Sequence, residues 1–326
     1  MTGAILEFDR PIVELEEKIK ELRQFAREKE INLDAEIANL EKRVQALKEN
    51  IYQNLAPWQK VLVARHPERP NMLDYINRLC TDFVQLHGDR LYGDDPALAG
   101  GIARFDGRPV TVLGQIKGRD TRENLARNFG MAHPEGYRMA MRLMRQAEKF
   151  HRPVLAFIDT PGAYPGMGAE ERGISNAIAE CIQTMLMLEV PVLSVIIGEG
   201  GSGGALALAS GDCILIQEHA VFSVISPEAY ASILWKDSSR AREAAGVMKI
   251  TAADLEALHL VDEVIPEPLG GAHHDPDGAA ERIREVLSRR LPELAARPVG
   301  QLLAARGEKF RRIGDPRIYL TGNDIT

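Results

Sequence analysis

The chain has 326 residues, of which 45% are hydrophobic and 27% are charged, and this composition is ample for a buried core. Its formal net charge of -7 argues against a general affinity for nucleic acid or for an anionic membrane surface. Three widely spaced cysteines argue against a disulfide framework or a cysteine zinc site, and the first ten residues have no apolar signal segment, so we expect a cytoplasmic enzyme.

The first sixty residues carry two apolar patterns with helical spacing. One covers residues 12–22 and the other covers residues 33–51, where charged residues flank the apolar positions. Asn32 and Asp34, at the start of the second pattern, offer turn and N-cap chemistry. We expect an antiparallel helical hairpin over residues 1–60 that packs on the globular part of the chain or on a partner.

Strands and helices alternate after the hairpin, and this pattern predicts an α/β domain over residues 61–291. Val192–Ile197 is nearly all apolar, as in parallel strands that helices cover on both faces. The tail, residues 292–326, carries no recognisable motif. The other expected strands are Pro109–Ile116, Val154–Ile158, Cys213–Gln217 and Val221–Ile225. The expected helices are Glu135–Phe150, Ala169–Leu188, Gly203–Ala209, Pro227–Trp235, Ser238–Met248, Thr251–Leu258 and Gly278–Arg290.

Two glycine-rich turns each follow a buried strand and each begin a helix. They cover residues 159–166 and 198–204, about one strand–helix–strand repeat apart, so both should emerge at the same edge of the sheet. Glycine lets the backbone approach a ligand closely, and the first N–H groups of a helix have no acceptor within it. Converging N–H groups of this kind stabilise negative charge that develops on oxygen. The two turns therefore predict an oxyanion site.

The second turn also fits three other interpretations. Residues 198–203 match G-x-G-x-x-G, and Glu218 follows at dinucleotide-binding spacing, but the next helix has only about seven residues, which is short for a crossover. The same turn holds Ser202 in a G-x-S-x-G nucleophile elbow, yet neither His219 nor His259 has a defensible triad position. Both turns can also serve only to let strand and helix pack closely.

Three further features are weaker. Residues 226–228 (Ser-Pro-Glu) follow a strand and begin a helix, which is typical of capping. The basic residues near position 120 can contact phosphates or remain in solvent. His273 and His274 are adjacent, but no histidine spacing matches a known ligand motif, so we expect no metal in this chain.

Several longer stretches occur together and in order: Ile158–Gly166, Gly168–Gly173, Gly198–Ala207, Phe222–Glu228, Asn128–Met131 with Pro134–Arg138, and Ile265–His273. They resemble the carboxyltransferase α subunit of bacterial and plastid acetyl-CoA carboxylase, and the similarity extends from the hairpin to about residue 290. The resemblance implies a crotonase-like (ClpP-like) spiral of ββα repeats. One departure is His259, at a position where crotonase-like chains often carry glycine.

The resemblance also implies that this chain is half of an enzyme. The family's β subunit carries a four-cysteine zinc ribbon and most of the acetyl-CoA site, whereas the α subunit faces carboxybiotin on the biotin carboxyl carrier protein. The expected assembly is an α2β2 heterotetramer that makes malonyl-CoA, in the committed step of fatty-acid synthesis. A separate biotin carboxylase subunit consumes the ATP.

The chemistry implied by the resemblance needs backbone donors rather than a side-chain base. Release of the carboxyl group leaves negative charge on the biotin ureido oxygen, and the freed N1 is basic enough to take the methyl proton. The expected donors are Gly203, Gly204, Gly162 and Ala163. The expected substrate-lining residues are Gly200, Gly201, Ser202, Tyr164, Pro165, Gly166, Ser226, Pro227 and Glu228. The expected contacts to the CoA phosphates are Lys117, Arg119 and Arg122.

Two rival functions remain open at this point. One is a non-catalytic assembly scaffold. The other is a self-sufficient crotonase-like hydratase or decarboxylase acting on acyl-CoA, which needs a carboxylate base near the turns. Glu170 and Glu199 are the nearest candidates for that base.

Overall fold

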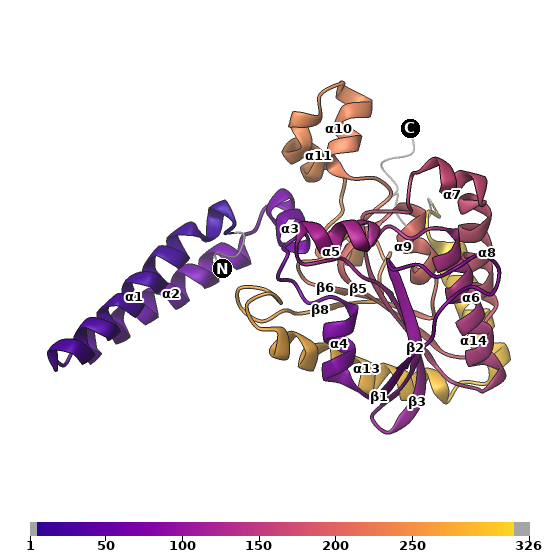
Figure 1. Cartoon of the computed structure of the whole chain (residues 1–326), viewed down its shortest axis with the longest axis horizontal. Helices are drawn as coiled ribbons and strands as arrows, with labels where there is room; N and C mark the ends of the chain where they lie inside the picture. The colour runs from indigo at the N-terminus through magenta and orange to yellow at the C-terminus, as the bar shows by residue number, and fades with distance from the viewer. Residues whose placement is uncertain (1–4, 316–326) are drawn as a thin grey trace.

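An extended helical hairpin projects from an α/β body (Figure 1). The computed structural model describes residues 5–315, so the outermost parts of the expected hairpin and tail, residues 1–4 and 316–326, lie outside the described residues. After a short 3-10 turn, η1 (Glu7–Asp9), the hairpin consists of α1 (Arg10–Lys29) and α2 (Asp34–Gln53). The expected hairpin is confirmed.

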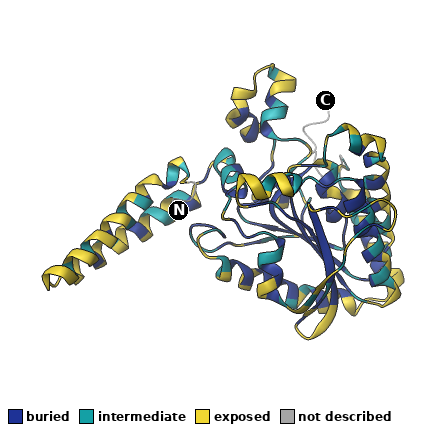
Figure 2. Cartoon of the chain, in the orientation of Figure 1, coloured by how far each residue is buried: buried dark blue, intermediate teal, exposed yellow. Residues whose placement is uncertain are grey.

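The hairpin is held together by the apolar seam that the sequence pattern predicts. The buried residues along it are Ile12, Ile19, Ile37 and Val44, and partly buried leucines pack against them. The outer faces of both helices are exposed over most of their length (Figure 2). Only the base of the hairpin packs on the body, where the same cluster includes Val63.

A mixed sheet forms the centre of the body, with strands in the order β1-β2-β3-β4-β5-β6-β8 and β7 paired to the end of β5. The first three strands are antiparallel and the rest pair in parallel. The strands are β1 (Cys80–Gln85), β2 (Leu98–Phe105), β3 (Arg108–Gln115), β4 (Val154–Thr160), β5 (Val192–Gly201), β6 (Cys213–Gln217), β7 (Val221–Ser223) and β8 (Glu263–Ile265).

Helices cover both faces of this sheet and form one apolar core on each face. The first core packs α6 (Pro134–Lys149), α8 (Ile174–Met187) and α9 (Ser202–Ala209) on the sheet, and the second packs α4 (Met72–Leu79) and α13 (Pro276–Ala295) on its other face. Every residue of β4 and β5 is buried, which explains their apolar sequences. The remaining helices are α3 (Pro57–Ala64), α5 (Thr121–Ala126), η2 (Asn128–Gly130), α7 (Met167–Glu171), α10 (Pro227–Trp235), η3 (Ser238–Arg240), α11 (Ala241–Val247), α12 (Ala252–Ala257) and α14 (Val299–Arg312).

The structure corrects several expected boundaries. The single helix expected over residues 169–188 is two helices, α7 and α8, because Gly173 has φ 78 and interrupts the chain between them. The helix expected over residues 238–248 is η3 followed by α11. Strands β1, β2 and β8 were not expected. His259 has φ 53, the conformation in which glycine is favoured.

The C-terminal tail contains a helix, α14, that was not expected from the sequence. Helix α13 continues past the expected boundary at residue 291, and α14 follows it. Arg306 on α14 is 1% exposed and forms an ion pair with Asp212, with Nη2 2.7 Å from Oδ2. The tail is therefore integrated in the core up to this helix. Within residues 5–315, no helix is both long and apolar enough to cross a membrane.

Candidate functional site

The two glycine-rich turns lie side by side at one edge of the sheet, as expected. Thr160 at the end of β4 pairs with Gly200 at the end of β5. The pairing of the two strands shifts register between Ile158 and Thr160, and the N–H of Glu199 donates to Asp159 Oδ1 at 2.9 Å. This hydrogen bond links the two turns.

Two glycines of the second turn permit this close approach. A Cβ on Gly201 would lie 2.1 Å from the carbonyl oxygen of Pro161. A Cβ on Gly204 would lie 2.6 Å from the carbonyl carbon of Gly162 and 2.7 Å from the nitrogen of Ala163. Neither position has room for a side chain, because the obstructing atoms belong to the backbone of the first turn.

The start of α9 presents N–H groups that the fold does not use. N–H groups in the first turn of a helix have no acceptor within it, and α9 has no side-chain cap. Elsewhere in the described residues 5–315, no acceptor takes up the N–H groups of Gly203 or Gly204. Both expected donors are therefore without an acceptor among the described residues.

The first turn supplies fewer donors than expected. The N–H of Gly162 donates to the hydroxyl oxygen of Thr160 at 3.1 Å, and that hydroxyl donates back to the Gly162 carbonyl at 2.6 Å. The N–H of Tyr164 donates to Ala132 O at 3.1 Å. Ala163 lies between them, and its N–H has no acceptor within the part of the chain that the structure describes. Of the two donors expected from this turn, Gly162 and Ala163, Ala163 is therefore the one without an acceptor.

Ser202 has part of the geometry of a nucleophile elbow. It has φ 54 at the junction of β5 and α9, and its side chain is exposed. However, His219 is buried and its ring lies 5.7 Å from that of Tyr52, whereas His259 lies just beyond α12. Neither histidine is hydrogen-bonded to Ser202 among the described residues, so the triad that a hydrolase needs is not assembled.

An aromatic wall borders the first turn. The ring of Tyr164 stacks on His133, with ring centroids 4.1 Å apart and an interplanar angle of 21°. A Cβ on Gly166 would lie 2.3 Å from this tyrosine ring, and Pro165 beside it is exposed. Burial lowers the pKa of His133, which favours its neutral form. His133 was not expected here, because its contact with Tyr164 joins segments that no local pattern relates.

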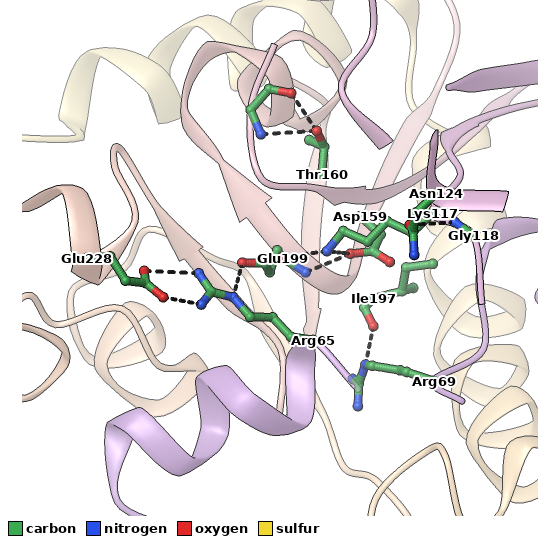
Figure 3. A network of polar contacts seen from close by, with 11 residues as sticks. Arg65, Arg69, Lys117, Gly118, Asn124, Asp159, Thr160, Ile197, Glu199 and Glu228 are labelled. Carbon is green, nitrogen blue, oxygen red and sulfur yellow. Dashed lines mark hydrogen bonds and ion pairs between the residues drawn. The ribbon is translucent and has the colours of Figure 1, made fainter. Parts of the chain in front are cut away.

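A network of charged side chains lies next to the turns (Figure 3). Arg65 Nε is 2.6 Å from Glu199 Oε1, and Lys117 Nζ is 2.5 Å from Glu199 Oε2. Lys117 also contacts Asp159 Oδ1 at 2.8 Å, and Arg65 Nη1 contacts Glu228 Oε1 at 2.5 Å. The network thus connects α3, β4, β5 and α10 around the two turns.

This network fixes the charge of Glu199. Burial would raise the pKa of Glu199, but Lys117 and Arg65 outweigh it and lower that pKa to about 2. The carboxylate is therefore ionised and both of its oxygens are held by cations. Such a group is poorly suited to act as a general base, which argues against the hydratase role considered for Glu199. Glu170, the other candidate, is exposed on α7.

The three expected residues at the start of α10 have structural contacts. Ser226 caps α10, because its hydroxyl accepts the N–H of Ala229 at 3.2 Å, and Pro227 occupies the first turn of this helix. Glu228 belongs to the charged network through Arg65. Glu228 lies in the first turn of α10, where its charge suits the helix dipole as expected, and Ser226 supplies the cap.

A cavity of about 220 Å³ lies beside the network and beneath the first turn. Lys117, Arg119, Asp159, Pro161 and Glu199 are among its lining residues. The ammonium group of Lys117 is committed to two carboxylates, and Arg119 is paired with Asp74. Arg122 is exposed on α5 and does not line the cavity. The expected basic cluster is thus dispersed rather than converging on one point.

Comparison with known proteins identifies relatives over almost the whole chain. A family model described as acetyl co-enzyme A carboxylase carboxyltransferase-like matches residues 5–314. The acetyl-coenzyme A carboxylase carboxyl transferase subunit alpha of Carboxydothermus hydrogenoformans is 57% identical over 314 residues, which is 96% of this chain and 97% of the relative. The subunit of the same name from Halorhodospira halophila is 54% identical over 317 residues, which is 97% of this chain and 100% of the relative.

Solved structures with the same fold are more distant in sequence. A Pseudomonas malonate decarboxylase heterotetramer in complex with coenzyme A matches with a TM-score of 0.56 at 20% identity, over 70% of this chain and 90% of that one. The transcarboxylase 12S core matches with a TM-score of 0.54 at 20% identity, over 67% of this chain and 41% of that one. At this level of identity the likeness concerns the fold alone, and the expected crotonase-like fold is confirmed.

Proposed function

The chain belongs to the acetyl co-enzyme A carboxylase carboxyltransferase-like family, and from this premise we propose that it is the α half of a biotin-dependent carboxyltransferase. The reaction moves a carboxyl group from carboxybiotin to acetyl-CoA and yields malonyl-CoA, the committed step of fatty-acid synthesis. One observation carries the assignment of the site. The N–H groups of Gly203 and Gly204 have no acceptor within residues 5–315, and Gly204 lies directly against the turn that contains Gly162 and Ala163.

The turns act on the oxygen that gains charge. When the bond between N1 of biotin and the carboxyl carbon breaks, its electron pair stays on the ureido group as negative charge, largely on oxygen, and carbon dioxide is released. The N–H groups of Gly203 and Gly204, together with that of Ala163, stabilise this charge by hydrogen bonding. A donor fixed in the backbone needs little reorganisation when the charge develops, which is why no ionisable side chain is required.

The second half of the reaction transfers a proton. N1 of biotin is basic once the carboxyl group has left, and it takes a proton from the methyl group of acetyl-CoA. The resulting enolate carbon attacks the carbon dioxide and forms the new carbon–carbon bond of malonyl-CoA. Atoms and charge balance without a side-chain base, in agreement with the ionised and doubly paired state of Glu199.

The charged network serves the turns as a support. Lys117 joins the ends of β4 and β5 through Asp159 and Glu199, and Arg65 ties β5 to α10. Groups that stabilise a transition state must be held close to their productive positions by surrounding contacts. In this proposal Lys117 is a positioning residue rather than a contact to CoA phosphate. Arg119 and Arg122 remain the candidate phosphate contacts in this chain.

Acetyl-CoA activation requires a partner chain. We assign the zinc ribbon and the oxyanion donors for the acetyl thioester to a β subunit, in an α2β2 heterotetramer located in the cytoplasm. Biotin arrives on the biotin carboxyl carrier protein, and a biotin carboxylase uses ATP to load it. Exposed apolar side chains on α7 and α9 beside the turns, Met167 and Leu206, and on α10, Ile233 and Leu234, fit such an interface.

Reconstitution tests the proposal. The chain is purified alone and together with a β subunit of a close relative, and malonyl-CoA formation is measured with carboxylated carrier protein and acetyl-CoA. We expect turnover only when both chains are present. Hydration of an unsaturated acyl-CoA by this chain alone would support the hydratase instead. A stable complex of both chains without any carboxyl transfer would favour the scaffold.

A further inference from the structure

A histidine pair at the base of the hairpin has no role in the carboxyltransferase chemistry. Both ring nitrogens of His273 are buried, and neither has a hydrogen-bond partner within the described residues. A neutral imidazole has one N–H to donate and one lone pair to offer, and leaving such groups unpaired away from water is costly. The centroid of this ring lies 4.2 Å from that of His66 and 4.5 Å from that of His274.

A buried carboxylate faces the same place from the other side. Asp9, at the start of α1, is only 5% exposed. Its Oδ2 accepts a hydrogen bond from the hydroxyl of Tyr52 at 3.0 Å, but its Oδ1 has no partner within residues 5–315. Two segments far apart in the chain thus each place buried ligand atoms without a partner at the base of the hairpin.

The ligand atoms are close enough together to share one ion. One atom each from Asp9, His273 and His274 lies within 4.8 Å of the other two. These residues line a cavity of about 160 Å³, and Glu68 and His66 line it as well. Two imidazoles and a carboxylate are ligands typical of Zn²⁺ and related divalent transition metals, whose bonds to them are about 2.0–2.2 Å long. The lone pair of a neutral imidazole and an ionised carboxylate oxygen are the forms that bind these ions.

We propose that Asp9, His273 and His274 form a binding site for a divalent transition-metal ion of the Zn²⁺ class. Closure of the three ligand atoms around the ion requires shifts of about an ångström or less, and the exposed His274 side chain has room to make them. Glu68 lines the same cavity, and water completes the coordination of the ion. The absence of a local histidine motif does not bear on such a site, because its ligands come from opposite ends of the chain.

The site would join the hairpin to the catalytic body. Asp9 precedes α1, whereas His273 and His274 lie in the loop between β8 and α13. In that loop the N–H of Ala272 donates to Glu267 at 2.7 Å, and Glu267 is paired with the fully buried Arg69. Arg69 in turn donates to the carbonyl of Ile197, immediately before the second turn. The ion therefore anchors the hairpin to a loop that supports the end of β5.

Metal titration tests the site directly. The full-length chain, without a histidine tag, is stripped with a chelator and titrated with Zn²⁺ by calorimetry and with Co²⁺ by absorption spectroscopy. We expect one equivalent to bind, with cobalt bands typical of nitrogen and oxygen ligands. We also expect the ion to raise the melting temperature and to slow amide exchange in residues 10–29.

Two variants separate ligation from folding. His274→Ala removes an exposed side chain, and Asp9→Asn keeps the shape and the acceptor for Tyr52 while removing the charge. Each should weaken metal binding at least tenfold and abolish the thermal shift, while the melting temperature of the metal-free protein stays near that of the parent. His151→Asn, an exposed histidine outside the cavity, is the matched control and should bind normally.

Three results would overturn the proposal. These are no stoichiometric binding by the parent chain, binding that both variants retain, and binding that His151→Asn loses to the same extent. None of these measurements depends on carboxyl transfer, so failure of this site and failure of the proposed function are distinguishable.

Discussion

Gly204 is a residue at which one added carbon atom must disturb the site. In Gly204→Ala, the new Cβ would lie 2.6 Å from backbone carbon of the first turn, so the two turns must separate. We expect the rate of carboxyl transfer to fall by about a hundredfold or more, since loss of one oxyanion donor costs on the order of 10²–10³ in kcat. The measurement is kcat in the reconstituted enzyme, with the melting temperature as a check of folding.

The matched control is Gly307→Ala on α14, where the nearest atom to a new Cβ is the end of the Arg311 side chain at 3.5 Å. This variant should keep parental kcat and gain about 0.5–1 kcal/mol of stability. Parental activity in a folded Gly204→Ala protein would remove the oxyanion assignment.

Ser202 separates the oxyanion interpretation from the nucleophile interpretation. Its φ of 54 matches an elbow, but no histidine among the described residues is bonded to it. Ser202→Ala should therefore retain carboxyl transfer within a few-fold of the parent, because the backbone N–H groups remain in place. Steady-state kinetics with the partner chain measure this. A folded variant with near-complete loss of activity would revive the hydrolase.

Glu199 gives the site a characteristic dependence on acid. Its pKa is lowered from 4.5 to about 2 in the folded chain, so its contribution to stability is fully present above about pH 4.5 and is lost as the pH falls toward 2. The parent should be more stable than Glu199→Gln at pH 6, and the difference should shrink below pH 4.5. Urea unfolding of both proteins across this range measures it. A difference that does not change with pH would show that the carboxylate is not stabilised by its cations.

Sequence patterns predicted the two turns of the candidate site better than the side chains around them. Gly203 and Gly204 could be predicted, because glycine content and a strand-to-helix junction are local signals. Arg65 could not be predicted, since its partner Glu199 lies 134 positions away. The competing acceptor for Gly162 was missed for a different reason. It is a hydroxyl two residues earlier, and its orientation depends on the geometry of the turn.

Helix α14 shows how one residue attaches an element. The guanidinium of Arg306 donates to both oxygens of Asp212 and also to the carbonyls of Met185 and Leu188 at the end of α8. A cation at the end of a helix compensates its unpaired carbonyls. Arg306→Met should cost about 3–5 kcal/mol in the free energy of unfolding, because it leaves Asp212 buried without its charge partner.

Urea unfolding checks this value, and the control is Arg311→Met one turn further along α14. The Arg311 side chain is 77% exposed, and its change should stay within about 0.5 kcal/mol. Equal effects of the two substitutions would contradict an anchoring role for Arg306.

Element prediction succeeded where periodicity was strong. The hairpin follows a regular 3–4 spacing of apolar residues, and β4 and β5 begin with apolar runs. The structure confirms these elements. Strand β1 was not predicted because its residues are exposed or partly exposed. Strand β2 was not predicted because it contains two adjacent glycines, Gly100 and Gly101. Helix α14 was not predicted because a buried ion pair attaches it to the body, and apolar periodicity does not reveal such a contact.

The whole molecule consists of an α/β body, with the candidate site at one edge of its sheet, and two projections. The edge holds the turns, the hairpin extends from α3, and α10 with α11 forms a second outlying lobe (Figure 1). The overall fold followed from the resemblance of long motifs, and comparison with relatives confirmed it. The sequence of one chain does not reveal which face a partner covers, because exposed apolar residues such as Met167 and Leu206 carry no periodic signal.

The most direct test of the central claim is a structure of the assembled α and β chains with biocytin bound. The account predicts that the ureido oxygen lies about 2.7–3.1 Å from the backbone nitrogen of Gly203 or Gly204, with Ala163 facing it from the first turn. A ureido oxygen held only by the partner chain, with no N–H of this chain within hydrogen-bonding distance, would contradict the account.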